Sequence, residues 1–206
     1  MSIDFGDLKL TMDPFENFER WMGEAQAAKL PEPTAMTLAT ASRAGRPSAR
    51  IVLYKGLSQQ SGKGFRLFTN YESRKSGDLN DNAQAALVFF WAPLNRQIRV
   101  EGRVEKLNEA ESDVYFQSRP RGSRIGAWAS PQSQKIKSRD ELLERVRKVE
   151  ERFQNEEMIP RPPNWGGWLL VPERIEFWQA GEFRLHDRFV FEREKNGEWS
   201  VSRLSP

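Results

Sequence analysis

Two groups of residues in the first half of the chain have the types and spacing of a phosphate site. Arg50 and Lys55 stand at the ends of a short apolar run, and Ser73, Arg74 and Lys75 follow on a later loop. Arginine can bind a phosphate through two parallel hydrogen bonds, and lysine adds a compact positive charge. Such residues are also common on ordinary protein surfaces, so the residues alone leave both interpretations open.

A second cluster lies near the middle of the chain, at the end of a predicted helix. It contains Tyr115, Arg119, Arg121, Ser123 and Arg124. This set would suit another phosphate, helped by backbone N–H donors at a helix N-terminus. Cations near a helix C-terminus also complement the helix dipole, which is the simpler alternative.

A third set of candidates lies further towards the C-terminus. Arg184, His186 and Arg188 alternate along the chain, so in an extended segment all three would point to one face. Two guanidinium groups and an imidazole on one face need an anionic or planar partner. A single histidine is, however, more often structural than catalytic. The nearby Trp-Gly-Gly-Trp at residues 165–168 is most simply a tight turn with core aromatics.

The composition excludes several kinds of chemistry. The 206 residues include no cysteine and one histidine, which excludes disulfides, thiolate sites and a multi-histidine metal site, so we expect no metal. The net charge of +3 is too small to indicate nucleic-acid binding. No secretory signal or membrane-length apolar stretch is visible, and a cytoplasmic setting fits.

No familiar catalytic or nucleotide-binding motif is visible in the chain. We find no Ser-His-Asp arrangement, no phosphate-binding loop of the GxxxxGK type and no glycine-rich dinucleotide fingerprint. The redox or transfer chemistry must therefore come from a bound organic group.

A single domain at residues 13–206 must position these candidates, after a short flexible leader at residues 1–12. Asp13 and Pro14 are typical of a helix start, and Pro31 ends that helix. Capping residues predict further helices at 108–118 and from Ser138 onward. Runs with strand patterning fill most of the remainder, at 36–41, 48–57, 64–70, 85–91, 97–107, 168–171, 174–180, 188–194 and 199–204.

This succession of elements predicts the fold class. Many short strands with scattered helices are typical of a mostly β, α+β domain built around a closed or partly closed antiparallel barrel with peripheral helices.

The candidate segments, taken in order, resemble the pyridoxine/pyridoxamine 5'-phosphate oxidase family. The resemblance covers roughly residues 13–206, and the long ordered set of matches makes it specific, although any one segment would be weak. The matching segments include residues 50–55, Thr69-Asn70, Ser73-Arg74-Lys75, Tyr115-Phe116, Ser118-Arg119-Pro120, Gln132-Ser133, Glu176-Phe177-Trp178-Gln179 and the run from Arg184 to Arg188.

The resemblance implies a fold, a cofactor and a reaction. The fold would be an FMN-binding split β-barrel, antiparallel and Greek-key-like, in a homodimer with the flavin at the subunit interface. The reaction would be oxidation of pyridoxine or pyridoxamine 5'-phosphate to pyridoxal 5'-phosphate by O2, releasing H2O2, in vitamin B6 metabolism.

The resemblance also implies roles for individual residues, some of them acting from the other subunit. Arg184 and His186 would be catalytic, with Arg184 packed over the substrate ring. The substrate would be held by Lys55, Tyr115, Arg119, Ser123, Arg184 and His186. The flavin would be held by Arg50, Ile51, Val52, Leu53, Lys55, Phe68, Thr69, Arg74, Lys75, Gln97, Gln132, Ser133, Trp178 and Arg188.

The chain departs from the family pattern at four places, and the property that these departures would alter is substrate affinity or identity. Residues 1–12 contain no Arg and no Tyr, whereas relatives often carry a basic, Tyr-containing segment there that folds over the substrate. Arg124 stands where Gln is usual, Ala180 where Gly is common, and Phe68 where Tyr is common.

Two other functions stay open beside the B6 reaction. One is a flavin oxidase of the same fold with another substrate, of the phenazine-pathway type. The other is a non-catalytic barrel that binds flavin or nucleic acid, because barrels of this kind can bind strands through basic and aromatic residues.

Overall fold

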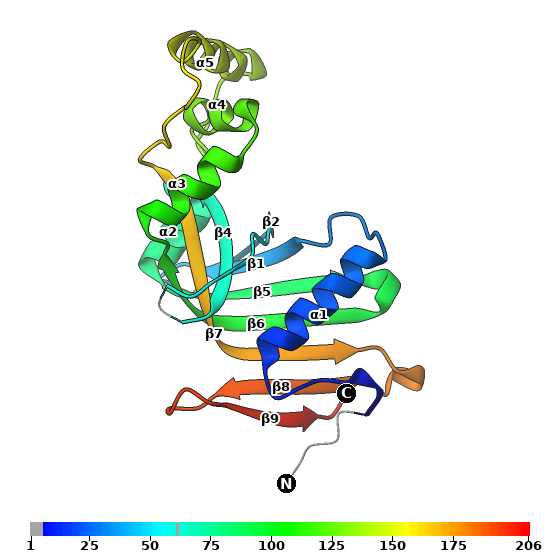
Figure 1. Ribbon diagram of the computed structural model, residues 1–206. Coiled ribbons are helices and arrows are strands. Elements are labelled where there is room, and N and C mark those ends of the chain that lie inside the picture. Colours follow the sequence, from blue (N-terminus) through cyan, green and yellow to red (C-terminus); the bar gives the residue numbers. More distant parts are fainter. Residues whose placement is uncertain (1–5, 61) are drawn as a thin grey trace.

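The computed structural model describes residues 6–60 and 62–206, and its centre is one antiparallel sheet of nine strands (Figure 1). Strand β7 is the longest and is shared by two parts of the sheet: its first half pairs with β4 and its second half with β8. The strands are β1 (Ala35–Ala41), β2 (Pro47–Leu53), β3 (Leu57–Ser58), β4 (Gly64–Asn70), β5 (Gln84–Trp91), β6 (Arg96–Lys106), β7 (Trp165–Gln179), β8 (Asp187–Arg193) and β9 (Trp199–Leu204).

The sheet closes on itself through the segment that follows β2. The strand order is β2-β1-β5-β6-β7-β4-β3. The N–H of Lys55 donates to the carbonyl of Arg66 in β4 (2.9 Å), and the N–H of Arg66 donates to the carbonyl of Gly56 (3.0 Å). These bonds join β4 to the segment that links β2 to β3, and β8 and β9 extend the sheet beyond the closed part. The predicted antiparallel split barrel with peripheral helices is therefore confirmed.

The predicted first helix is α1 (Pro14–Ala27), which covers one face of the sheet. The Asp13 carboxylate accepts hydrogen bonds from the N–H groups of Phe15 and Glu16, as an N-cap should. Phe15, Phe18 and Trp21 are buried against the barrel, and each contributes roughly 1.5–3 kcal/mol of burial free energy. The opposite face of β5, β6, β7 and β8 has no such helix over it (Figure 1), and we call it the open face.

The predicted flexible leader is wrong for residues 6–12. Leu8 and Leu10 are buried in the main core, and Arg20 of α1 donates to the carbonyl of Leu8 (2.9 Å). A short 3-10 turn forms at Gly6–Leu8. The first five residues lie outside the described part of the chain.

Three helices stack beside the barrel and end in a projecting arm (Figure 1). They are α3 (Glu109–Ser118), α4 (Arg121–Ala129) and α5 (Arg139–Arg152), and they enclose a small second core around Phe116, Phe153 and Trp165. The predicted helices at α3 and α5 are confirmed, with Asn108 and Ser138 as their N-caps. Two helices, α4 and α2 (Arg74–Asp81), were not predicted from the sequence.

The two glycines of the Trp-Gly-Gly-Trp segment do not form the predicted turn. Gly166 and Gly167 lie inside β7, which runs without interruption where two strands were expected. A Cβ atom on Gly166 would lie 2.2 Å from the hydroxyl of Tyr71, and one on Gly167 would lie 2.4 Å from Leu107. These positions require glycine because neighbouring side chains fill the space, and not because of a special backbone conformation.

Candidate functional site

A cavity of about 310 Å³ lies where β2, β4 and α3 meet. All of its lining residues except Trp165 are residues that the family resemblance implies for the flavin or the substrate. The lining residues are Ile51, Val52, Leu53, Lys55, Phe68, Thr69, Lys75, Tyr115, Arg119, Gln132 and Trp165.

Lys75, at the start of α2, is the most restrained cation of the cavity. Its Nζ donates to the hydroxyls of Thr69 (2.9 Å) and Ser73 (3.0 Å) and to the side-chain oxygen of Gln132 (2.9 Å). Burial, with a smaller contribution from the positive charge of Arg50, lowers the pKa of Lys75 to about 8. No carboxylate forms a salt bridge with Lys75 in the described part of the chain, so an anion bound here would relieve the cost of burying its charge.

Arg119 has a donor that lacks a partner. Its guanidinium lies 4.6 Å from the centre of the Trp165 ring, and its Nη1 is buried with no hydrogen-bond partner among the described residues. Burial lowers the pKa of Arg119, although a guanidinium keeps its proton. Buried N–H groups nearly always have an acceptor, so the cavity fits a ligand that brings an anionic oxygen to Arg119.

Three aromatic rings lie nearly parallel along one wall of the cavity. The rings of Phe68 and Tyr115 stack at 3.9 Å with 18° between their planes, and Phe68 lies 5.7 Å from Trp165 at 13°. Stacked rings of this kind suit packing against another planar ring. Phe68, which departs from the common Tyr, keeps the stacking surface and lacks only the hydroxyl.

A second cavity of about 250 Å³ adjoins the first, sharing Arg119, Gln132 and Trp165 with it. Ser123, a predicted substrate contact at the start of α4, lines this second cavity. Trp165 lines both cavities but was not predicted as a site residue, because the Trp-Gly-Gly-Trp pattern indicates a turn. The second cavity is lined by Asn70, Arg119, Ser123, Gly126, Ala127, Ser130, Gln132 and Trp165.

Four basic or polar residues that were singled out from the sequence do not line either cavity. Arg50 donates to the carbonyl of Leu38 (3.0 Å) within the sheet, and Arg74 is exposed. Ser133 is exposed, with a φ of 70°. The departing residue Arg124 turns away to donate to the side-chain oxygen of Gln117 (2.7 Å).

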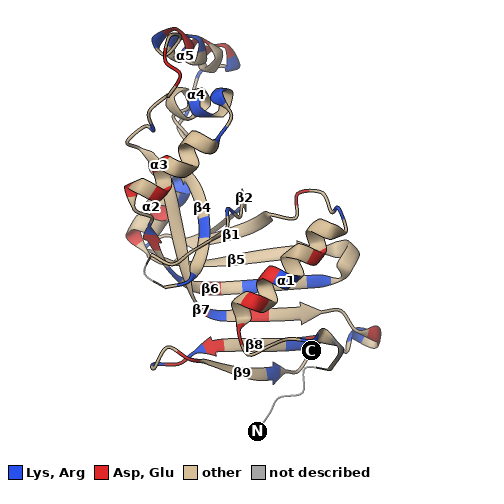
Figure 2. Cartoon of the chain, viewed as in Figure 1, with Lys and Arg blue, Asp and Glu red and all other residues tan. Residues whose placement is uncertain are grey.

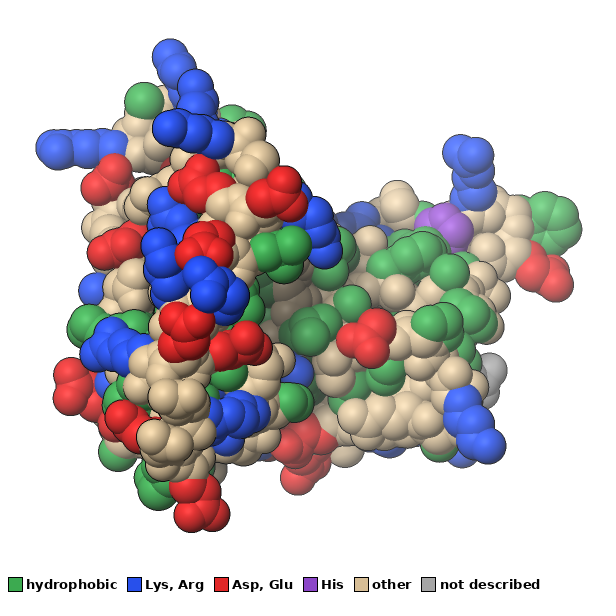
Figure 3. Space-filling view, turned by 90° about the horizontal axis from the view of Figure 1, so that it is seen from above, with side chains coloured by type: hydrophobic (Ala, Val, Ile, Leu, Met, Phe, Trp, Pro, Cys, Tyr) green, Lys and Arg blue, Asp and Glu red, His purple; other side chains and the backbone are tan. Residues whose placement is uncertain are grey.

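The remaining predicted residues are far from the cavities in this chain. Gln97, Trp178 and Arg188 lie at the end of the sheet where β7 turns into β8, and Arg184 and His186 lie on the turn itself. Figure 1 shows this turn at the opposite end of the sheet from α3 and α4, and Figure 3 shows the single histidine on a projection away from the helical arm. One chain therefore does not bring the two groups of predicted residues together.

The turn that carries Arg184 does not have the extended conformation that the alternation suggested. Phe183 and Arg184 have positive φ angles of 54° and 65°, so Arg184, His186 and Arg188 do not form one regular row. The N–H of Gly181 donates to Nδ1 of His186 (3.2 Å), and the His186 ring lies 4.7 Å from that of Trp178. Non-glycine residues with positive φ are uncommon and cluster at functional sites.

Comparison with known proteins places the chain in a family. Residues 22–153 match the family model described as pyridoxamine 5'-phosphate oxidase, which is more than half of the chain. The chain belongs to the pyridoxamine 5'-phosphate oxidase family. Residues 165–206 match a second model, described as the pyridoxine 5'-phosphate oxidase C-terminal dimerisation region.

Curated relatives in this oxidase family align along nearly the whole chain. A pyridoxine/pyridoxamine 5'-phosphate oxidase of Cupriavidus necator is 55% identical over 94% of this chain and 89% of its own length. One from Burkholderia lata is 56% identical over all of this chain and 94% of its own. The predicted family and the predicted enzyme class, an oxidoreductase, are confirmed.

Solved structures in the same fold family superpose closely. PhzG from Burkholderia lata, in complex with tetrahydrophenazine-1-carboxylic acid, has a TM-score of 0.89 and 29% identity over 99% of this chain and 98% of its own. An FMN-binding protein from Nostoc punctiforme, related to pyridoxamine 5'-phosphate oxidase, has a TM-score of 0.74 over 96% of this chain and 100% of its own. At 18% identity, the latter shows the shared fold alone. None of the helices in the described part of the chain is long and apolar enough to cross a membrane.

Proposed function

We propose that this oxidase binds FMN and converts pyridoxine or pyridoxamine 5'-phosphate into pyridoxal 5'-phosphate, with O2 as the electron acceptor and H2O2 as the second product. The observation that carries the proposal is the buried, unpartnered Nη1 of Arg119, in a cavity that also holds Lys55 and Lys75. Two separate cationic regions beside an aromatic wall fit two phosphorylated ring compounds.

The cofactor side of the cavity is the part around Lys75. Lys75, Thr69 and Gln132 form a connected polar group that would hold the FMN phosphate, and β2 and Phe68 would line the flavin. When bound, FMN supplies the two-electron redox chemistry that no side chain of this protein can perform.

The substrate side of the cavity is the part around Arg119. Arg119 and Ser123 would bind the substrate phosphate, helped by the N-terminus of α4. Lys55, whose Nζ lies 6.0 Å from the centre of the Tyr115 ring, would add positive charge. These groups fix the position and orientation of the substrate, which is the main contribution of the protein to the rate.

A second copy of the chain completes the site in this proposal. The open face presents the exposed side chain of Phe90, and Ile51 and Leu53 of β2 are exposed on the same side of the sheet. Exposed apolar patches often mark interfaces. Ile51 and Leu53 also line the cavity, so the cavity reaches this face. The match to the dimerisation region, at residues 165–206, includes the turn with Arg184. In the proposed dimer, the partner chain would place this turn over the substrate ring.

The test is to purify the protein, record its flavin spectrum and follow pyridoxal phosphate and H2O2 formation. We expect a yellow protein that oxidises both 5'-phosphates and turns over unphosphorylated pyridoxine at least about a hundredfold less efficiently, because the phosphate contacts are lost. A colourless protein, or equal rates with and without the phosphate, would contradict the proposal.

The similarity to PhzG supports a second candidate, oxidation of a phenazine precursor. The two Burkholderia lata relatives weigh against it, because this chain is 56% identical to the oxidase and 29% identical to PhzG. Turnover of a reduced phenazine carboxylic acid but not of either 5'-phosphate would favour this second candidate.

A further inference from the structure

Glu176 is a buried carboxylate in the middle of the open face. Its side chain is only 1% exposed, although most of the side chains next to it on this face are charged. Three arginines surround it: Arg188 (2.8 Å), Arg174 (3.3 Å) and Arg99 (3.5 Å). Burial alone raises the pKa of Glu176, but hydrogen bonding and the arginine charges outweigh it, so the pKa lies below its ordinary value.

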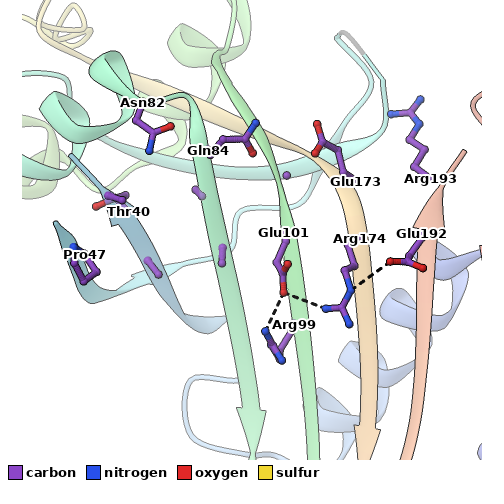
Figure 4. Close-up of a pocket in the computed structure, with 15 residues that line it drawn as sticks. Thr40, Pro47, Asn82, Gln84, Arg99, Glu101, Glu173, Arg174, Glu192 and Arg193 are labelled. Carbon is purple, nitrogen blue, oxygen red and sulfur yellow. Dashed lines mark hydrogen bonds and ion pairs between the residues drawn. The ribbon is translucent and has the colours of Figure 1, made fainter. Parts of the chain in front are cut away.

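Arg188 depends on Glu176 more than the other two arginines do. Arg99 and Arg174 also pair with Glu101 (2.9 and 3.1 Å), and Figure 4 shows Glu101 between them. Arg188 has no second carboxylate among the described residues. Positive and negative positions are mixed along β6, β7 and β8 (Figure 2), so removing one carboxylate leaves the other pairs of this network in place.

The bonds to Arg188 leave part of its guanidinium free. Nε donates to Oε1 of Glu176 at 2.8 Å, and Nη2 forms an ion pair with the same oxygen at 2.8 Å. Nη1 donates to the carbonyl of Ser205 at 3.0 Å. A guanidinium has five N–H donors, so these contacts do not use all of them. The side chain is therefore held in one orientation while it keeps donors for a ligand.

The neighbours of Arg188 are the other residues expected to reach the flavin from the end of the sheet. Trp178 is directly opposite Arg188 on β8 and opposite Gln97 on β6. Residues directly opposite one another on neighbouring strands point to the same face, so these three side chains share the open face with Glu176.

We propose that Glu176 is a positioning residue for the cofactor site, which orients Arg188 and so strengthens FMN binding by the dimer. This inference rests on the proposed function, in which Arg188 contacts the flavin. Glu176 itself would not touch the flavin, because three guanidinium groups cover its carboxylate.

FMN affinity of the apoprotein, measured by quenching of flavin fluorescence, tests the role directly. We expect Glu176→Gln to weaken FMN binding by roughly ten- to a hundredfold, as for partners that orient a ligand-binding group elsewhere. Glu192→Gln removes an exposed carboxylate from the same face, 3.8 Å from Arg174, and should change the affinity less than about twofold. Equal losses in the two variants would overturn the proposal.

A double-mutant cycle shows whether Glu176 acts through Arg188. Arg188→Ala should weaken FMN binding, and Glu176→Gln added to it should weaken binding no further. Independent, additive losses, or an unchanged affinity in Arg188→Ala, would overturn the proposal. Glu176→Asp keeps the charge for folding but shortens the side chain, so it should bind FMN as weakly as Glu176→Gln while remaining dimeric by light scattering. If the wild-type protein itself bound no FMN, the proposed function would fail instead.

Discussion

Individual side chains in the cavity show what residue types can and cannot predict. The sequence indicates that Arg50, Lys55, Arg74 and Lys75 form one basic group. Only the two lysines line the cavity, and Arg50 is bonded within the sheet. The direction of a long side chain depends on neighbours such as Thr40, which accepts from Arg50 at 2.9 Å. Lys75 and Arg119 are cations buried without a carboxylate partner, and this can be recognised only from the three-dimensional structure.

The lowered pKa of Lys75 predicts that FMN binding depends on pH. Below pH 8 Lys75 is protonated and attracts the phosphate, and above pH 8 the free protein loses this proton. A bound dianion raises that pKa, so affinity should fall by up to about tenfold per pH unit above 8. Lys75→Arg stays charged and should give a flatter profile from pH 7 to 9. Equal slopes for both proteins would show that another group titrates.

Arg184 should affect turnover far more than cofactor content. It is exposed on its turn in the single chain, and in the proposed dimer it packs over the substrate ring. We expect Arg184→Ala to lower kcat by about a hundredfold through lost alignment, with FMN content within about twofold of wild type. Lys195→Ala, an exposed control on the following turn, should match wild type. Wild-type rates in Arg184→Ala would refute the role.

The turn between β7 and β8 is the element that sets the position of Arg184 and His186. A Cβ on Gly181 would lie 2.0 Å from the carbonyl oxygen of Leu185, so glycine is required there. Ala180 precedes it and has no positive φ, which explains how this chain tolerates alanine where glycine is common. The positive φ angles of Phe183 and Arg184 then fix the shape of the tip.

Gly181→Ala should therefore disturb the turn and leave the barrel intact. We expect kcat to fall by about a hundredfold while the melting temperature drops only a few degrees, because no core residue changes. Ala180→Gly is the matched control and should keep wild-type kinetics. The comparison needs steady-state rates and thermal melts of both variants, and an unchanged kcat in Gly181→Ala would show that the shape of the turn is unimportant.

Helices and strands with strong local sequence signals could be predicted from the sequence. Those that depend on tertiary contacts could not. The Asp13 cap and the apolar stripe of α1 identify that helix without tertiary information. Helix α2 contains Gly77 and only one buried apolar residue, Leu79, and α4 contains two glycines. Glycine disfavours helix, so contacts with the rest of the fold decide these segments. The glycines of β7 were misread for the same reason, since their neighbours come from distant positions.

In the whole molecule, nearly all of the cavity lining belongs to the residues that the family resemblance implies. Composition and spacing could not show that the other implied residues lie apart from the cavity in one chain. The cavity residues and the turn residues lie at opposite ends of one sheet (Figure 1). A two-fold dimer uses the same surface on both chains, so two copies meeting through the open face would form two sites. Each site would combine the cavity of one copy with the turn of the other.

Mixed dimers of two inactive chains test this sharing most directly. Arg119→Ala damages the cavity and Arg184→Ala damages the turn. If the two variants are co-expressed with different tags, about half of the dimers are mixed, and each mixed dimer has one intact site and one doubly damaged site. A shared site predicts that the unseparated mixture recovers about a quarter of wild-type activity, and that all of this activity is found in the doubly tagged dimers. If that fraction is as inactive as the two parent variants, each site is built within one chain and the shared site is contradicted.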